Sequence, residues 1–98
     1  MAFTVDEIKR TVIPKAKSYG IKSVRLFGSY ARGEASDSSD VDLLIDRGEL
    51  GGLVQYFSFV NELEDVLGCH VDVVTSGISD KEFLDGIIME GVLLYAAD

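Results

Sequence analysis

Residues 28–46 read GSYARGEASDSSDVDLLID, and this stretch decides both the fold and the chemistry open to the chain. It begins with Gly28-Ser29 and, after ten further residues, reaches Asp40-Val41-Asp42 at the head of an apolar run. A glycine directly after a strand lets an anion approach the backbone, whose N–H groups can then surround it. The Gly-Ser pair alone is also typical of a plain tight turn, so the acids carry the stronger signal.

Asp40 and Asp42 are separated by one residue, which places both side chains on the same side of a strand. At about 3.3 Å rise per residue their Cα atoms lie roughly 6.6 Å apart, and Val41 faces the opposite side. Paired carboxylates suit Mg²⁺, which takes oxygen ligands and bridges protein to substrate phosphate. Two like charges this close repel each other, so a bound cation explains the pair best. The alternative is a polar edge strand with hydrated aspartates.

Asp72 is a single acid inside the β-branched run His70-Val71-Asp72-Val73-Val74. Burying it is costly unless it is paired or bound to a metal. If its strand lies beside the one that carries Asp40 and Asp42, it joins them as a metal ligand and as the base that activates an incoming hydroxyl. The alternative is an aspartate at a strand end that reaches water. His70 shares the face, but a single histidine is more often structural, and we do not include it among the candidates.

Arg32 and the serines that follow it form the rest of the candidate site. As a functional residue, Arg32 is a fork-shaped donor to phosphate oxygens; its alternative role is a local ion pair with Glu34 or Asp37. We expect Ser38 and Ser39 to shape the approach to the strand through side-chain-to-backbone hydrogen bonds. We also expect Ser39 to contribute to nucleotide binding.

The flanking sequence predicts an α/β fold: a small mixed β-sheet with helices packed on one face, formed by residues 1–98 as a single domain. A Thr4–Glu7 capping box starts the first helix, which Gly20 ends and Pro14 should kink or split. The other expected elements are strands at 23–27, 40–45 and 69–75, a helix at about 50–67, a helix capped by Ser79 or Asp80 that runs to about residue 90, and a short strand or terminal segment at 92–95.

The apolar residues of the 50–67 helix cover more than the roughly 100° that one core contact needs. Either the small fold buries both sectors, or Tyr56 and Phe59 belong to a partner interface. The apolar tail at 87–95 leaves the same two possibilities, because large exposed apolar patches usually mark contacts.

Composition narrows the function classes. The chain has 98 residues and a net charge of −8, which argues against a nucleic-acid backbone as the main ligand. It has one cysteine, Cys69, which is consistent with a reducing compartment. We find no apolar run long enough to span a membrane and no signal pattern, and we therefore expect a cytoplasmic protein.

The combination of motifs resembles the minimal nucleotidyltransferases of the DNA polymerase β-like superfamily: Gly28-Ser29, ten residues, Asp40-Val41-Asp42, Arg32-Gly33 between them, and Asp72 on a later strand. The resemblance covers essentially the whole chain and implies the nucleotidyltransferase fold. It also implies ATP as donor and two Mg²⁺ ions held by Asp40, Asp42 and Asp72. In this family resemblance, Gly28 and Ser29 bind the triphosphate. Family members of this size often act as antitoxins that adenylylate a tyrosine of a helical HEPN ribonuclease toxin.

Several functions stay open on the sequence alone. The leading hypothesis is AMP transfer from ATP to a hydroxyl of a partner protein. A non-catalytic antitoxin or binding module that acts by occlusion is the first alternative, although three convergent acids argue against a vestigial site. Transfer to a small molecule or an RNA end is the second, and the −8 charge argues against RNA. A homo-oligomer is also left open.

Overall fold

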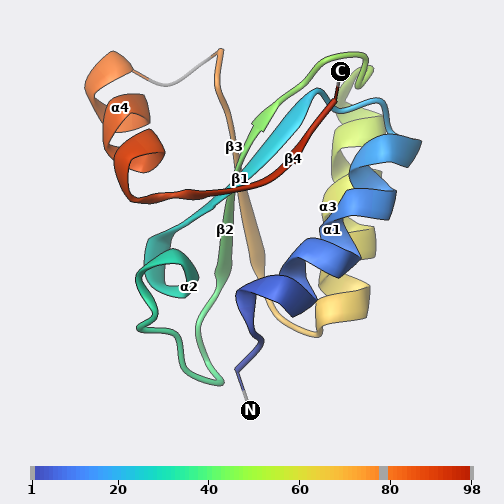
Figure 1. Cartoon of the computed structure of the whole chain (residues 1–98). Helices are drawn as coiled ribbons and strands as arrows, with labels where there is room; N and C mark the ends of the chain where they lie inside the picture. The colour runs from blue at the N-terminus through green and yellow to red at the C-terminus, as the bar shows by residue number, and fades with distance from the viewer. Residues whose placement is uncertain (1, 78–79, 98) are drawn as a thin grey trace.

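The computed structural model describes residues 2–77 and 80–97. Four helices and four strands alternate along these residues (Figure 1). In chain order they are α1 (Val5–Ser18), β1 (Ser23–Phe27), α2 (Gly28–Arg32), β2 (Val41–Asp46), α3 (Leu53–Leu67), β3 (Val71–Thr75), α4 (Lys81–Glu90) and β4 (Val92–Ala96).

The four strands form one mixed sheet in the order β3-β2-β1-β4. β1 pairs antiparallel with both β2 and β4, whereas β2 and β3 run parallel. The parallel pair is possible because α3 carries the chain back to the start of β3. The register of this pair matters most for function, since it sets Asp42 directly opposite Asp72. The predicted mixed sheet is confirmed.

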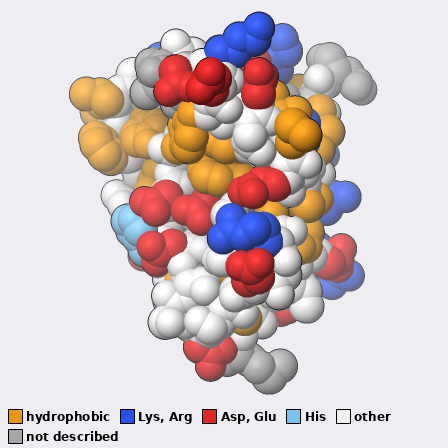
Figure 2. All heavy atoms as spheres, turned by 90° about the vertical axis from the view of Figure 1, so that its left-hand side faces the viewer, with side chains coloured by type: hydrophobic (Ala, Val, Ile, Leu, Met, Phe, Trp, Pro, Cys, Tyr) orange, Lys and Arg blue, Asp and Glu red, His pale blue; other side chains and the backbone are white. Residues whose placement is uncertain are grey.

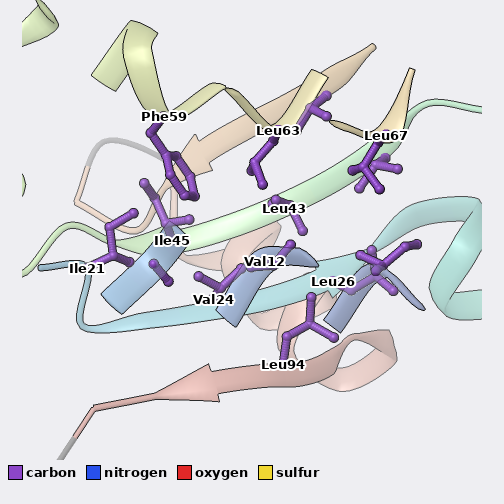
Figure 3. Close-up of a cluster of buried hydrophobic side chains, with 14 of the residues drawn as sticks. Val12, Ile21, Val24, Leu26, Leu43, Ile45, Phe59, Leu63, Leu67 and Leu94 are labelled. Atoms are coloured by element: carbon purple, nitrogen blue, oxygen red, sulfur yellow. The ribbon is translucent and has the colours of Figure 1, made fainter. Parts of the chain in front are cut away.

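The two long helices, α1 and α3, lie side by side on one face of the sheet (Figure 1). Every second residue on the central strands points towards these helices, and the side chains pack together in one core (Figure 3). Phe59, Leu63 and Val12 from the helices are fully buried there. The prediction of helices on one face therefore holds for α1 and α3. The shorter α4 contacts β1 and α2 and lies on the other side of the sheet.

Helix α1 begins with the predicted capping box. The Thr4 hydroxyl accepts from the Glu7 N–H at 3.1 Å, and the Glu7 carboxylate accepts from the Thr4 N–H at 2.9 Å. Of the two outcomes expected at Pro14, a kink or a split, the split does not occur, because the helix is continuous through Ser18. Val12 and Ala16, on either side of the proline, are both fully buried. Tertiary packing of this face outweighs the one hydrogen bond that proline removes.

Residues 28–32 form a short helix, α2, in a segment where the sequence analysis expected no helix. Tyr30 explains the difference. Its ring is 95% buried in the main core, and its hydroxyl accepts a long hydrogen bond from the Phe3 N–H at 3.5 Å. Burying this large side chain holds the segment in a helical turn until Gly33, at φ 73°, ends it.

Two expectations about α3 need correction. The helix starts at Leu53 rather than Leu50, because Gly52 is its N-cap, and Leu50 is buried in the preceding loop. Phe59 is fully buried in the core and cannot contact a partner. Tyr56 is half-buried, and its hydroxyl donates to the Val73 carbonyl at 3.1 Å.

The last predicted helix is confirmed. Asp80 caps it by accepting from the Phe83 N–H at 2.9 Å, while the alternative cap, Ser79, lies outside the described residues. The tail at 92–95 forms the edge strand β4. Across the part of the chain that the structure describes, no helix combines the length and apolar character needed to cross a bilayer.

Candidate active site

The three predicted acids come together at one end of the β2–β3 pair. Asp42 and Asp72 are direct register partners on these adjacent strands, and Asp40 immediately precedes β2. Alternation along β2 turns Val41 and Leu43 into the core and leaves Asp42 on the opposite, open face. One ligand atom each from Asp40, Asp72 and His70 lies within 4.8 Å of the others. The structure thus places Asp72 beside Asp42 in register and close to Asp40, as expected for its strand, whereas Asp42 is not one of the three residues whose ligand atoms all lie within 4.8 Å of one another.

Gly28 lies directly against one of these acids. The register pairs Phe27, at the end of β1, with Asp42, so the next residue reaches over the Asp42 side chain. A Cβ at Gly28 would overlap the Asp42 carboxylate, and Gly28 adopts φ 74°, a conformation that glycine favours. Both facts require glycine at this position. The start of the Gly28-Ser29 segment and the carboxylates therefore line one continuous surface.

The close acids alter the titration of Asp42. Partial burial, followed by the negative charges of Asp72 and Asp40, raises the pKa of the Asp42 carboxyl above its ordinary value, and Arg32 offsets part of this effect. A folded chain that holds these charges together without a counter-ion is electrostatically unfavourable. A divalent cation coordinated by the same oxygens would remove the repulsion.

Arg32 makes the local ion pair that was its alternative role, with Nε at 3.4 Å from a Glu34 oxygen. It also contacts a residue that the sequence did not suggest. Its Nη1 lies 3.3 Å from Oε1 of Glu90, at the end of α4, and the same oxygen accepts from the Gly28 N–H at 3.4 Å. Glu90 is 58 residues away from Arg32 in the sequence, so only the packing of α4 could reveal this contact.

Ser39 shapes the loop before β2 as expected. Its hydroxyl accepts from the Ser36 N–H at 2.8 Å, which is the predicted side-chain-to-backbone bond. Ser29 lies in the first turn of α2, and its carbonyl accepts from the Glu34 N–H at 2.9 Å. Neither contact tests a role in nucleotide binding, which stays a prediction for both serines.

His70 belongs to the site although the sequence analysis set it aside. Its Nε2 lies 2.8 Å from Oδ1 of Asp72, and its Nδ1 lies 2.9 Å from Oε2 of Glu64. Asp72 is the main reason that the pKa of His70 is raised. The His-x-Asp spacing in a strand was the available signal, because it places both side chains on one face.

The open face of the molecule combines charge with apolar surface. In Figure 2, acidic side chains gather beside the single histidine and a basic group, and hydrophobic side chains cover the area above them. Exposed apolar residues near the end of α4 and on β4 include Met89 at 89% and Leu93 at 47%.

Comparison with known proteins now decides the family. The family model described as polymerase β nucleotidyltransferase matches residues 10–98, nearly the whole chain. The chain belongs to the polymerase β nucleotidyltransferases.

Relatives within this family have similar lengths. A Methanocaldococcus jannaschii protein assigned as a protein adenylyltransferase is 41% identical over 88 residues, which cover 90% of this chain and 95% of the relative. The protein adenylyltransferase MntA of Thermococcus cleftensis is 37% identical over 75 residues, covering 72% of this chain and 76% of MntA.

Solved nucleotidyltransferases share the fold. A protein assigned as a minimal nucleotidyltransferase superposes with a TM-score of 0.79 at 31% identity, covering 90% of each chain. A complex of a tri-AMPylated Shewanella oneidensis HEPN toxin with its MNT antitoxin matches with a TM-score of 0.72 at 16% identity, covering 94% of this chain and 72% of the matched chain. Because the identity is 16%, the second match shows only that the fold is shared.

Proposed function

We propose that this nucleotidyltransferase transfers AMP from ATP to a tyrosine hydroxyl of a partner protein. The observation that carries the proposal is that Asp42 lies opposite Asp72 in register and against Gly28, while the ligand atoms of Asp40 and Asp72 lie within 4.8 Å of each other. The relatives named as protein adenylyltransferases support AMP as the transferred group and protein as the acceptor.

The acids fit Mg²⁺ on their own chemistry. They offer only carboxylate oxygens, the donors that Mg²⁺ prefers. Partial burial and then the charges of Asp72 and Asp40 raise the pKa of Asp42, and a bound cation would offset that repulsion. Asp40, Asp42 and Asp72 would hold two ions, which when bound neutralise the phosphate charge and polarise the reacting phosphorus.

The remaining residues bind and orient the substrates. The Gly28 N–H and Arg32 already contact one anionic oxygen, that of Glu90, which supports their assignment as donors to the triphosphate of ATP. Ser29 and Ser39 are the further candidates for triphosphate contacts. Asp72, half exposed on the open face, is the candidate base for the acceptor.

The reaction that these groups support is an in-line displacement. The acceptor oxygen forms a bond to the α-phosphorus while the bond from that phosphorus to the bridging oxygen of the β-phosphate breaks. The hydroxyl proton passes to the Asp72 carboxylate, and pyrophosphate leaves with the bonding electrons. The products are a tyrosine–AMP ester and pyrophosphate.

We further propose that the acceptor is a helical HEPN-type toxin, which makes the chain an antitoxin. The AMPylated HEPN toxin in complex with an MNT antitoxin of the same fold supports this class of acceptor. The exposed apolar residues beside the acids are compatible with a protein that brings its tyrosine to the open face.

The test is transfer of label from α-³²P-ATP, with Mg²⁺, into proteins of a native lysate. Wild type is compared with the double variant Asp40→Asn/Asp42→Asn and with Asp46→Asn, a matched change at the other end of β2. We expect one labelled band with wild type and Asp46→Asn and none with the double variant. Mass spectrometry of the band then identifies the acceptor and its modified residue.

Each other result is informative. A band that persists in the double variant would overturn the metal assignment. A band that is not a HEPN protein would refute the antitoxin proposal but keep adenylyl transfer. A complex that forms without any label would favour the occluding module.

A further inference from the structure

His70 connects the candidate metal ligand Asp72 to a residue outside the site. Its two ring nitrogens contact two different carboxylates, Asp72 at 2.8 Å and Glu64 at 2.9 Å. Carboxylate oxygens accept hydrogen bonds, and the ring donates to both when it is protonated and to one when it is neutral. Each ring nitrogen thus already has a carboxylate oxygen within hydrogen-bond distance.

Glu64 provides a fixed end for this connection. It lies in the last turn of α3, and its Oε2 accepts from the Val71 N–H at 3.0 Å as well as from His70. Its side chain is 29% exposed, against 59% for His70 and 53% for Asp72. The His70 backbone is also fixed, because its carbonyl accepts from the Val41 N–H at 3.0 Å. The Glu64 contact of the ring and the Val41 contact of the backbone therefore fix the position of the imidazole beside Asp72.

Asp72 needs such support because of where it lies. Strand β3 is at the edge of the sheet, and the register partner of Asp72 on the inner side is another acid, Asp42. Repulsion between the two carboxylates favours rotamers that turn Asp72 towards water. His70 opposes this by binding Oδ1, which leaves the other oxygen of Asp72 for the shared site.

We propose that His70, anchored by Glu64, is a positioning residue that holds the Asp72 carboxylate in the orientation that the metal site requires. The inference rests on the proposed function, in which Asp72 is a ligand. Groups that orient ligands in this way typically change metal affinity or activity by about 10- to 100-fold when removed.

The test uses Mn²⁺ as the probe, titrated into the whole chain with a non-hydrolysable ATP analogue and followed by the EPR signal of free Mn²⁺. We expect His70→Ala to weaken Mn²⁺ binding at least about tenfold. Glu64→Ala should weaken it less, and His70→Gln, which restores an N–H donor, should recover part of the loss. Asp65→Ala, beside Glu64 in α3, is the matched control and should bind as wild type does.

Two further measurements separate positioning from general stability. In the transfer reaction His70→Ala should lower kcat and leave KM for ATP nearly unchanged, since the proposed triphosphate donors are intact. The melting temperature of each variant in EDTA reports folding independently of metal. A variant that melts as wild type does but binds Mn²⁺ weakly supports positioning.

The inference is overturned if His70→Ala binds Mn²⁺ as wild type does while Asp72→Asn does not. Strong ¹⁴N coupling to bound Mn²⁺ that disappears in His70→Ala would also overturn it, because His70 would then be a ligand itself. If Asp72→Asn binds Mn²⁺ normally, the proposed metal site fails, and this inference fails with it.

Discussion

At the scale of single residues, the site depends on the absence of a side chain at Gly28. The Asp42 carboxylate occupies the space in which a Cβ would lie, so Gly28 and Asp42, the proposed metal ligand, are geometrically coupled. In the sequence, Gly28 and Asp42 are related only by their spacing within the motif. The antiparallel register of β1 and β2 explains why the pattern has that spacing.

We therefore predict that Gly28→Ala abolishes Mn²⁺ binding and transfer. The positive φ costs about 1–2 kcal/mol of stability, and the new methyl group displaces Asp42. Gly33→Ala is the control, because Gly33 has nearly the same φ, 73°, and nothing within 4 Å of its Cβ. Urea unfolding measures the stability of both, and we expect Gly33→Ala to lose stability but keep the metal. Equal metal binding by both variants would contradict the coupling.

Asp42 also makes the metal-free protein less stable than it could be. Because its pKa is raised above the ordinary value of 3.8, the folded state holds this proton more tightly than the unfolded state does. Its contribution to stability therefore falls as pH rises from the ordinary value through the raised one.

Asp42→Asn removes this penalty. We predict that it raises the melting temperature in EDTA at neutral pH, that the gain disappears below the ordinary pKa of aspartate, and that transfer is lost. Thermal unfolding of wild type and variant across the acidic to neutral range checks this. A gain that is largest at low pH would have the wrong sign and refute the assignment.

At the scale of elements, α4 determines how accessible the site is. Its last residue, Glu90, contacts both the Gly28 N–H and Arg32, the donors assigned to the triphosphate. In the proposed binding mode, the phosphate oxygens of ATP replace this carboxylate on the same donors. The short helix was predictable from the Asp80 cap, but its place against α2 was not, since it depends on contacts between distant segments.

Glu90→Gln should therefore bind a non-hydrolysable ATP analogue more tightly than wild type. Exposed ion pairs contribute about 0.2–1 kcal/mol, so the gain should be at most about fivefold in Kd. Calorimetric titration measures it, with Asp85→Asn on the same helix as the control for the loss of one negative charge. Equal gains in both variants would point to overall charge, and weaker binding by Glu90→Gln would show that Glu90 assists ATP.

At the scale of the whole molecule, burial decides which apolar residues are free for a partner. The pattern of α3 left Phe59 as either a core or an interface residue, and the structure buries it completely between α1 and the sheet. Phe57, two residues earlier in the same helix, is 55% exposed. A one-dimensional pattern cannot separate the two, because both are aromatic residues on a helix with a wide apolar surface.

Phe59→Ala should accordingly lower the free energy of unfolding by about 3–5 kcal/mol. For a domain with a total stability of about 5–15 kcal/mol this is a large fraction. Phe57→Ala, the same change on the exposed side, should stay within about 0.5 kcal/mol of wild type. Urea denaturation compares the two, and similar losses would contradict the assignment of Phe59 to the core.

The sequence by itself determined the order of the elements other than α2, the capping of α1 and α4 and the set of three acids, because these depend on local periodicity and on residues close in the chain. Only the tertiary structure decided that Asp42 and Asp72 face each other in register, that Pro14 stays within a continuous helix and that His70 and Glu90 reach the site. These features arise from contacts between segments far apart in the chain, whose energies exceed local preferences.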